Sequence, residues 1–72
     1  MNNKAKLIRG FKRYRDKATK EKTNGWTFKV RVYNNIIKII ENYQGEITGS
    51  ENFKGIPKVG PKVLEKIDTI LA

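Results

Sequence analysis

Seven residues near the C-terminus, GIPKVGP at positions 55–61, constrain the fold more than any other stretch of this chain. They contain two glycines and two prolines, and a helical pattern follows directly. Proline suits the first turn of a helix, because the N–H that it lacks would have no partner there. Glycine adopts backbone angles that are closed to other residues. The stretch therefore predicts a sharp turn that leads into a helix over residues 61–71.

Two longer helices are predicted upstream, over residues 4–21 and 27–43, from apolar residues spaced three and four apart. The two stripes are Leu7, Phe11, Tyr14 and Ala18 in the first helix, and Val30, Tyr33, Ile37 and Ile40 in the second. The β-branched residues within 36–40 are also compatible with a strand. The spacing of three and four residues over the longer window favours a helix. Gly10 weakens the first helix slightly.

A short fourth helix is predicted over residues 51–54, after a turn at Thr48-Gly49-Ser50. Ser50 is placed to cap it, and Gly45 is placed to end the preceding helix in a left-handed conformation. The expected fold class is all-α: a compact four-helix domain. Seventy-two residues suffice for one small domain, so we expect a single unit over residues 1–72 with a flexible start at residues 1–5.

The chain contains no cysteine and no histidine, which excludes disulfides, thiolate or imidazole metal sites and histidine-based catalysis. The lack of cysteine fits an intracellular location, which means the nucleus or another DNA-containing compartment for a eukaryotic or viral source. No stretch approaches the roughly 20 apolar residues that span a bilayer, and we expect no membrane partner.

Positive charge is concentrated in the first part of the chain. Residues 1–31 carry eleven basic and two acidic side chains, whereas residues 32–72 carry five of each. A polyanion is therefore the expected partner. The alternative is that the charge, +9 in total, only keeps a small domain soluble.

The predicted turn and the helices on either side of it form a candidate helix-hairpin-helix. Gly55 and Gly60 would let successive N–H groups, and the start of the last helix, converge on one anion. Lys58 and Lys62 would flank that anion, and a DNA phosphate fits the site. The alternative is a tight connection between helices that binds nothing.

Residues 33–71, YNNIIKIIENYQGEITGSENFKGIPKVGPKVLEKIDTIL, resemble the N-terminal lyase domain of family X DNA polymerases, the DNA polymerase beta type. The hairpin and the EKID segment are the more specific parts of this match. The resemblance implies four helices, DNA binding through the hairpin and a catalytic lysine. In that family a lysine amine attacks C1′ of a 5′-deoxyribose phosphate, forms a Schiff base and releases the sugar phosphate by β-elimination.

The resemblance assigns roles residue by residue. The matching catalytic positions are Lys66 for the nucleophile, Glu65 for the neighbouring acid and Tyr33 for the active-site tyrosine. The matching basic positions are Lys29 for the 5′-phosphate, Lys62 for a further phosphate and Lys54 beside the hairpin. The chemistry requires no cofactor. The family hairpin also holds a monovalent cation, Na⁺ or K⁺, and the carbonyls of Lys54, Ile56 and Val59 match its ligands.

Two departures from the family pattern affect the hairpin and its surroundings. Lys58 replaces the first glycine of the family's Gly-x-Gly, so its backbone has to adopt a glycine-like conformation with a side chain attached. Asn35 occupies a position that is basic in the family. The carboxylates of a nucleotidyltransferase are also missing, so this chain by itself is no polymerase. We expect a monomer or part of a longer polypeptide.

Two functions remain open. The first is a DNA repair domain that binds gapped or nicked DNA with a 5′-phosphate and acts as a 5′-deoxyribose-phosphate lyase, as in base excision repair. The second is a non-catalytic helix-hairpin-helix module that binds DNA or recruits a partner, as at the N-terminus of structure-selective endonucleases. A third interpretation, binding to a membrane surface, is weak because a core leaves no broad apolar face free.

Overall fold

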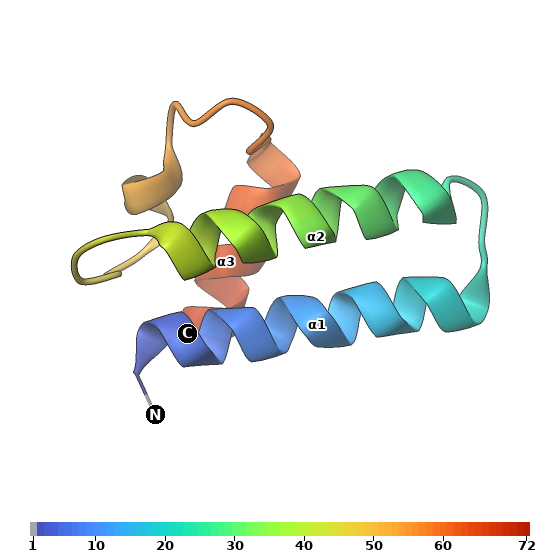
Figure 1. Cartoon of the computed structure of the whole chain (residues 1–72), viewed down its shortest axis with the longest axis horizontal. Coiled ribbons are helices and arrows are strands. Elements are labelled where there is room, and N and C mark those ends of the chain that lie inside the picture. Colours follow the sequence, from blue (N-terminus) through green and yellow to red (C-terminus); the bar gives the residue numbers. More distant parts are fainter. Residues whose placement is uncertain (1) are drawn as a thin grey trace.

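The computed structural model describes residues 2–72, and every regular element in that range is helical. Helices α1 (Asn3–Glu21) and α2 (Trp26–Asn42) lie side by side and antiparallel. Helix α3 (Pro61–Leu71) crosses this pair, beginning at the hairpin and ending beside α1 (Figure 1). Residue 1, part of the start expected to be flexible, lies outside the described residues, and Asn2 caps α1 by accepting a hydrogen bond from the Ala5 N–H at 2.8 Å.

The expected four α-helices are three α-helices and one short 3₁₀-helix, η1 (Ser50–Phe53). The bonds of η1 join residues three apart: the Asn52 N–H donates to the Gly49 carbonyl, and the Lys54 N–H donates to the Glu51 carbonyl. An element of four residues is too short to build a regular α-helix, whose hydrogen bonds join residues four apart. The prediction of a fourth α-helix was therefore wrong in type, although the element lies where it was expected.

Two predicted caps were also wrong. Helix α2 ends at Asn42, and its cap residue is Tyr43 in an extended conformation, so Gly45 at φ +108° lies beyond the helix. Ser50 is the first residue of η1 rather than its cap. Its N–H and hydroxyl instead donate to the two carboxylate oxygens of Asp68, at 3.1 and 2.9 Å. Asp68 of the EKID segment thus ties η1 to α3 and fixes the two sides of the hairpin.

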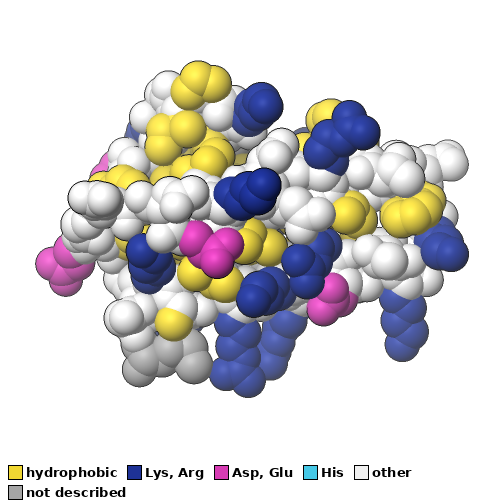
Figure 2. Space-filling view, in the orientation of Figure 1, with side chains coloured by type: hydrophobic (Ala, Val, Ile, Leu, Met, Phe, Trp, Pro, Cys, Tyr) yellow, Lys and Arg dark blue, Asp and Glu magenta, His cyan; other side chains and the backbone are white. Residues whose placement is uncertain are grey.

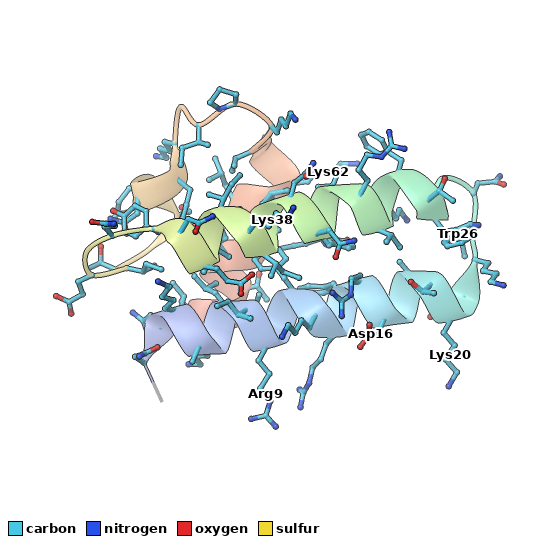
Figure 3. All side chains as sticks on the ribbon, in the orientation of Figure 1. Arg9, Asp16, Lys20, Trp26, Lys38 and Lys62 are labelled. Carbon is cyan, nitrogen blue, oxygen red and sulfur yellow. The ribbon has the colours of Figure 1, made fainter. Side chains whose placement is uncertain are left out.

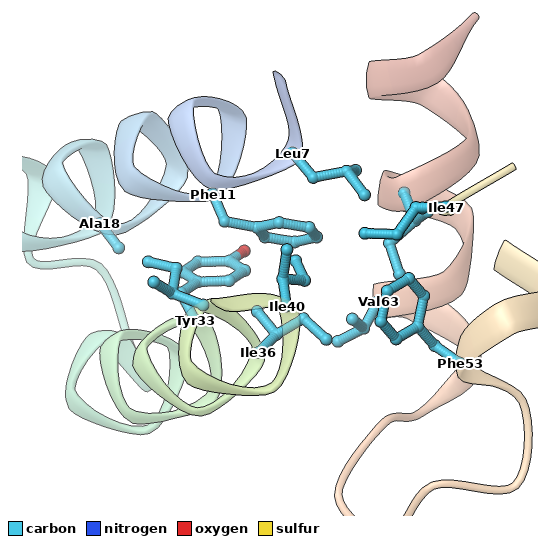
Figure 4. Packing of buried hydrophobic residues seen from close by; sticks show 11 residues of the cluster. Leu7, Phe11, Ala18, Tyr33, Ile36, Ile40, Ile47, Phe53 and Val63 are labelled. Atoms are coloured by element: carbon cyan, nitrogen blue, oxygen red, sulfur yellow. The ribbon is translucent and has the colours of Figure 1, made fainter. Parts of the chain in front are cut away.

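The core lies where the three α-helices and η1 meet (Figure 4). Most of the stripe residues predicted from spacing are buried, which confirms the buried faces of α1 and α2. The fully buried large side chains are Leu7, Phe11, Ile40, Phe53 and Ile67. Phe53 of η1 and Ile47 of the preceding loop close the core at the end next to the hairpin.

Gly10 marks the point where α3 crosses α1. A Cβ atom at this position would lie 2.6 Å from Cδ1 of Ile70, closer than any relaxed packing allows. The cost of a glycine inside a helix is therefore offset by the close approach of α3. One turn further along α1, Tyr14 meets Lys66, which lies one turn before Ile70 on α3.

Candidate nucleic-acid interface

The hairpin between η1 and α3 consists of two consecutive tight turns. The Ile56 N–H donates to the Phe53 carbonyl at 3.4 Å, and the Val59 N–H donates to the Ile56 carbonyl at 3.1 Å. Gly55 and Lys58 adopt left-handed conformations, with φ of +81° and +74°. The glycine-like backbone expected of Lys58 is confirmed. This conformation costs a residue with a side chain about 1–2 kcal/mol.

Four amides of the hairpin donate no hydrogen bond to any residue that the structure describes: those of Gly55, Lys58, Gly60 and Lys62. Pro57 and Pro61 lie between them and have no N–H. A backbone N–H is rarely left without a partner, so these groups are available to water or to a ligand. A glycine-containing turn that leads into the N-terminus of a helix is a typical place for an anion site.

Gly60 has neither a backbone nor a packing reason to be glycine. Its φ of −89° and ψ of 175° are open to any residue. A Cβ atom at this position would meet no described atom within 4 Å. A glycine that the fold does not require is expected where a ligand approaches the backbone closely.

Three lysines belong to the hairpin and its flanking residues. Lys54, Lys58 and Lys62 are all exposed, and none forms an ion pair within residues 2–72. Figure 3 shows Lys62 in the first turn of α3, directly after the hairpin. Three unpaired positive charges beside four free amides produce a site that favours a strong anion.

Lys66 lies one turn after Lys62 and is half-buried. Its ammonium nitrogen is 4.8 Å from the centroid of the Tyr14 ring, a cation–π contact. Tyr14 stacks in turn on Tyr33, with ring centroids 5.8 Å apart and an angle of 28° between the rings. The structure thus brings the predicted nucleophile and the predicted active-site tyrosine into one cluster, and Tyr14 of α1 joins them.

Tyr33 has a buried ring, with 9% of the residue exposed. Burial raises the pKa of its hydroxyl above the usual value, and the nearby Tyr14 adds to that shift. No described residue bonds to this hydroxyl, yet the described part of the chain has no buried side-chain polar atom without a partner. The hydroxyl therefore reaches solvent at the edge of the cluster, so Tyr33 belongs both to the core and to the surface.

Glu65 and Lys29 are not joined to Lys66 by any hydrogen bond or ion pair within the described residues. Both side chains are exposed, Glu65 on α3 and Lys29 in the first turn of α2. Phe28, next to Lys29, was missed by the sequence analysis. It is 68% exposed, the one large hydrophobic side chain of residues 2–72 that faces solvent to this extent. Exposed rings of this kind can stack on nucleic-acid bases.

The carbonyls proposed for a monovalent cation have free lone pairs. The Ile56 carbonyl accepts one hydrogen bond, from the Val59 N–H, and those of Lys54 and Val59 accept none from the described residues. A carbonyl oxygen has two lone pairs, so each of the three retains at least one that is free. Residues 2–72 contain no cluster of three or more acidic, histidine or cysteine side chains that could hold a metal.

Helices α1, α2 and α3 include none that is both long and apolar enough to cross a membrane, a finding that covers residues 2–72. Comparison with known proteins adds one positive result: a family model of the helix-hairpin-helix domain matches residues 2–72. No curated protein and no solved structure matches the chain.

Proposed function

The chain belongs to the helix-hairpin-helix domain family, and on this premise we propose that it binds DNA and that its hairpin backbone holds a DNA phosphate. Domains of this family typically bind DNA. The observation that carries the proposal is the group of four free amides at Gly55, Lys58, Gly60 and Lys62. Contacts of this kind fix the position of the protein on DNA without reading its sequence.

The preferred substrate within this proposal is gapped or nicked DNA with a 5′-phosphate. The resemblance to the lyase domain of family X polymerases supports this choice, as do the exposed positions of Lys29 and Lys62. Phe28 beside Lys29 offers an aromatic face to a base that is unstacked at the gap. Na⁺ or K⁺ held by the carbonyls of Lys54, Ile56 and Val59 would add positive charge next to the bound phosphate.

The proposed reaction is removal of a 5′-deoxyribose phosphate. The neutral amine of Lys66 attacks C1′ of the open-chain sugar, and loss of water gives an imine. A base, for which Glu65 and the Tyr33 hydroxyl are candidates, removes a proton from C2′. The C3′–O bond then breaks, and DNA with a 5′-phosphate leaves. Hydrolysis of the imine releases the unsaturated sugar phosphate and restores the amine. The cluster of Lys66, Tyr14 and Tyr33 supports this assignment, because it holds the amine at the edge of the core.

A second candidate function is DNA binding without catalysis. It is favoured by the contact between Lys66 and Tyr14 itself, because a ring face attracts an ammonium group and not a neutral amine. The amine has to leave the ring and lose its proton before it can attack. In a non-catalytic module the same contact would simply join α3 to α1.

Borohydride trapping separates the two functions, since it reduces an imine to a stable amine. The substrate is gapped DNA with a 5′-deoxyribose phosphate, at protein concentrations that saturate it. We expect a covalent adduct with the wild-type chain and almost none with Lys66→Ala. Lys62→Ala is the matched control, because it removes a lysine one turn away on the same helix. It should weaken binding but retain the adduct at saturation.

DNA binding by the hairpin and catalysis by Lys66 can be rejected separately. Undiminished trapping with Lys66→Ala would reject Lys66 as the nucleophile. Binding without any adduct would favour the non-catalytic module. Equal affinity for DNA with and without a 5′-phosphate would reject the preferred substrate. Unmoved NMR signals of Gly55 and Gly60 on addition of DNA would reject the hairpin as the binding site altogether.

A further inference from the structure

A second basic surface lies at the other end of α3, away from the hairpin. It is a shallow groove of about 820 Å³ along α1. Eight described residues line it: Asn3, Lys6, Arg9, Gly10, Arg13, Tyr14, Lys17 and Ile70. Four of them are basic and none is acidic. Figure 3 shows Arg9 pointing from α1 away from α2, and Figure 2 shows Lys and Arg side chains extending from this edge. We call this surface the α1 groove.

Three of the four basic side chains of the α1 groove have no acidic partner among residues 2–72. Of the two acidic residues on α1, Asp16 pairs with Arg15, outside the groove, and Glu21 is 4.0 Å from Lys17. Lys6, Arg9 and Arg13 form no ion pair within the described residues. Side chains of like charge in a row are unfavourable unless an anion or solvent screens them. An anionic partner would therefore stabilise this row.

The geometry of the row matches a nucleic-acid strand. Lys6 and Lys17 are eleven residues apart, which is about 16 Å along a helix at about 1.5 Å per residue. One DNA strand carries a phosphate about every 3.4 Å along its axis, so about five phosphates lie alongside this length. Ile70 packs on Gly10 at the floor of the groove, and Tyr14 leads from the groove to Lys66.

The α1 groove and the hairpin are separate contact sites at the two ends of α3. Gly60 and Ile70 are ten residues apart, which is about 15 Å of helix. Lys66 lies between them, over Tyr14. The distance between the two sites corresponds to about four phosphates of one DNA strand. Binding of one-arm and two-arm DNA therefore distinguishes a single segment that spans both sites from two separate segments.

We propose that the α1 groove binds the phosphate backbone of a second DNA segment, the arm on the other side of the gap from the one held by the hairpin. The assignment of the first arm to the hairpin rests on the proposed function. A membrane surface is the less favourable occupant, because the groove offers only Ile70 and the edge of Tyr14 as apolar contacts. The domain would thus contact both sides of a gap and select DNA in which two arms are present.

The test compares two DNAs: a gapped duplex with both arms, and a duplex that contains only the arm with the 5′-phosphate. The groove variant is Arg9→Gln with Arg13→Gln. The matched control is Lys12→Gln with Lys20→Gln, which removes the same charge from exposed positions on α1 outside the groove. Glutamine keeps the helix propensity of these residues. Fluorescence anisotropy at several salt concentrations gives the slope of log affinity against log salt concentration for each protein variant with each DNA.

With the gapped DNA, the groove variant should lower the magnitude of this slope by about 1.8, or about 0.9 for each phosphate that the protein no longer neutralises. With the one-arm DNA the groove variant should leave the slope unchanged. The control variant should leave the slope unchanged with both DNAs. Equal decreases on both DNAs, or no decrease on either, would overturn the proposal. Phosphatidylserine vesicles test the alternative occupant. If the groove variant abolishes binding to these vesicles but leaves DNA binding intact, the groove is assigned to membranes instead.

The proposal can fail independently of the hairpin site. NMR titration with the gapped DNA should shift the amide of Gly10 at the groove and that of Gly60 at the hairpin. In the hairpin variant Lys58→Gln with Lys62→Gln, the Gly60 shift should decrease and the Gly10 shift should remain. A shift of the Gly60 signal without a shift of the Gly10 signal would reject DNA binding at the groove alone. A shift of the Gly10 signal without a shift of the Gly60 signal would reject DNA binding at the hairpin alone.

Discussion

The ammonium nitrogen of Lys66 lies 4.8 Å from the centroid of the Tyr14 ring, and this contact joins α3 to α1 beside the hairpin. Lys66 is the residue that the sequence resemblance assigns as nucleophile, and Tyr14 is a residue that the resemblance does not mention. A contact of this kind is worth about 0.5–1 kcal/mol at an exposed site. The ring face attracts the ammonium group, so the contact holds the Lys66 side chain in place in the resting structure.

Replacing Tyr14 should therefore change how fast Lys66 reacts. In Tyr14→Leu, we expect reductive methylation of Lys66 by formaldehyde and cyanoborohydride to be about two- to fivefold faster, the equivalent of about 0.5–1 kcal/mol. In Tyr14→Phe the ring remains, and the rate should stay at the wild-type value. Mass spectrometry of the digested protein gives the rate, with Lys62 as an internal reference. A slower reaction in Tyr14→Leu would mean that the ring promotes attack instead.

The raised pKa of Tyr33 predicts a loss of stability at alkaline pH. The folded-state pKa of this hydroxyl is above the usual value of 10.0, so the unfolded chain ionises first. The contribution of Tyr33 to stability is fully present below about pH 10 and is lost as pH rises through the folded-state pKa. The wild-type chain should thus lose stability relative to Tyr33→Phe only above about pH 10. Denaturant unfolding from about pH 8 to about pH 11 measures the difference, and a constant difference would contradict the assignment.

The left-handed backbone of Lys58 predicts a difference between two variants that both remove its charge. Lys58→Gly relieves the strain of φ +74°, whereas Lys58→Ala retains it. The glycine variant should be more stable than the alanine variant by about 1 kcal/mol, after the higher entropy of unfolded glycine is taken into account. Both should reduce the salt slope of DNA binding by about 0.9. Equal stabilities would argue against the left-handed conformation.

Local patterns in the sequence predicted the helices and the hairpin well. Spacings of three and four residues located the buried faces of α1 and α2, and glycine and proline located the turn and the start of α3. The character of η1 was not predictable, because bonds between residues three and four apart are hard to tell apart over four residues. The DNA-binding roles at the hairpin remain predictions, since they depend on a partner.

Contacts between distant segments could not be read from local patterns. Gly10 looked like a weak point in a helix, and only the crossing of α3 explains it. The partnership of Tyr14 with Lys66 joins residues far apart in the chain and depends on the same crossing. The groove that contains Lys6, Arg9, Arg13 and Lys17 likewise depends on this crossing, because Ile70 of α3 lines it.

Gly60 offers a test that separates DNA binding from folding. The fold does not require glycine there, since φ is −89° and a Cβ atom would meet no described atom within 4 Å. Serine is a good residue at the cap of a helix, so Gly60→Ser should leave stability unchanged or raise it by a few tenths of a kcal/mol. Its side chain would, however, stand where the proposed phosphate approaches the amides. Losing a charged hydrogen bond of about 1.5–3 kcal/mol should weaken DNA binding about tenfold or more. Thermal melting and anisotropy titration measure the two effects on the same sample. An unchanged affinity would show that DNA does not approach this backbone, and the hairpin clamp would have to be abandoned.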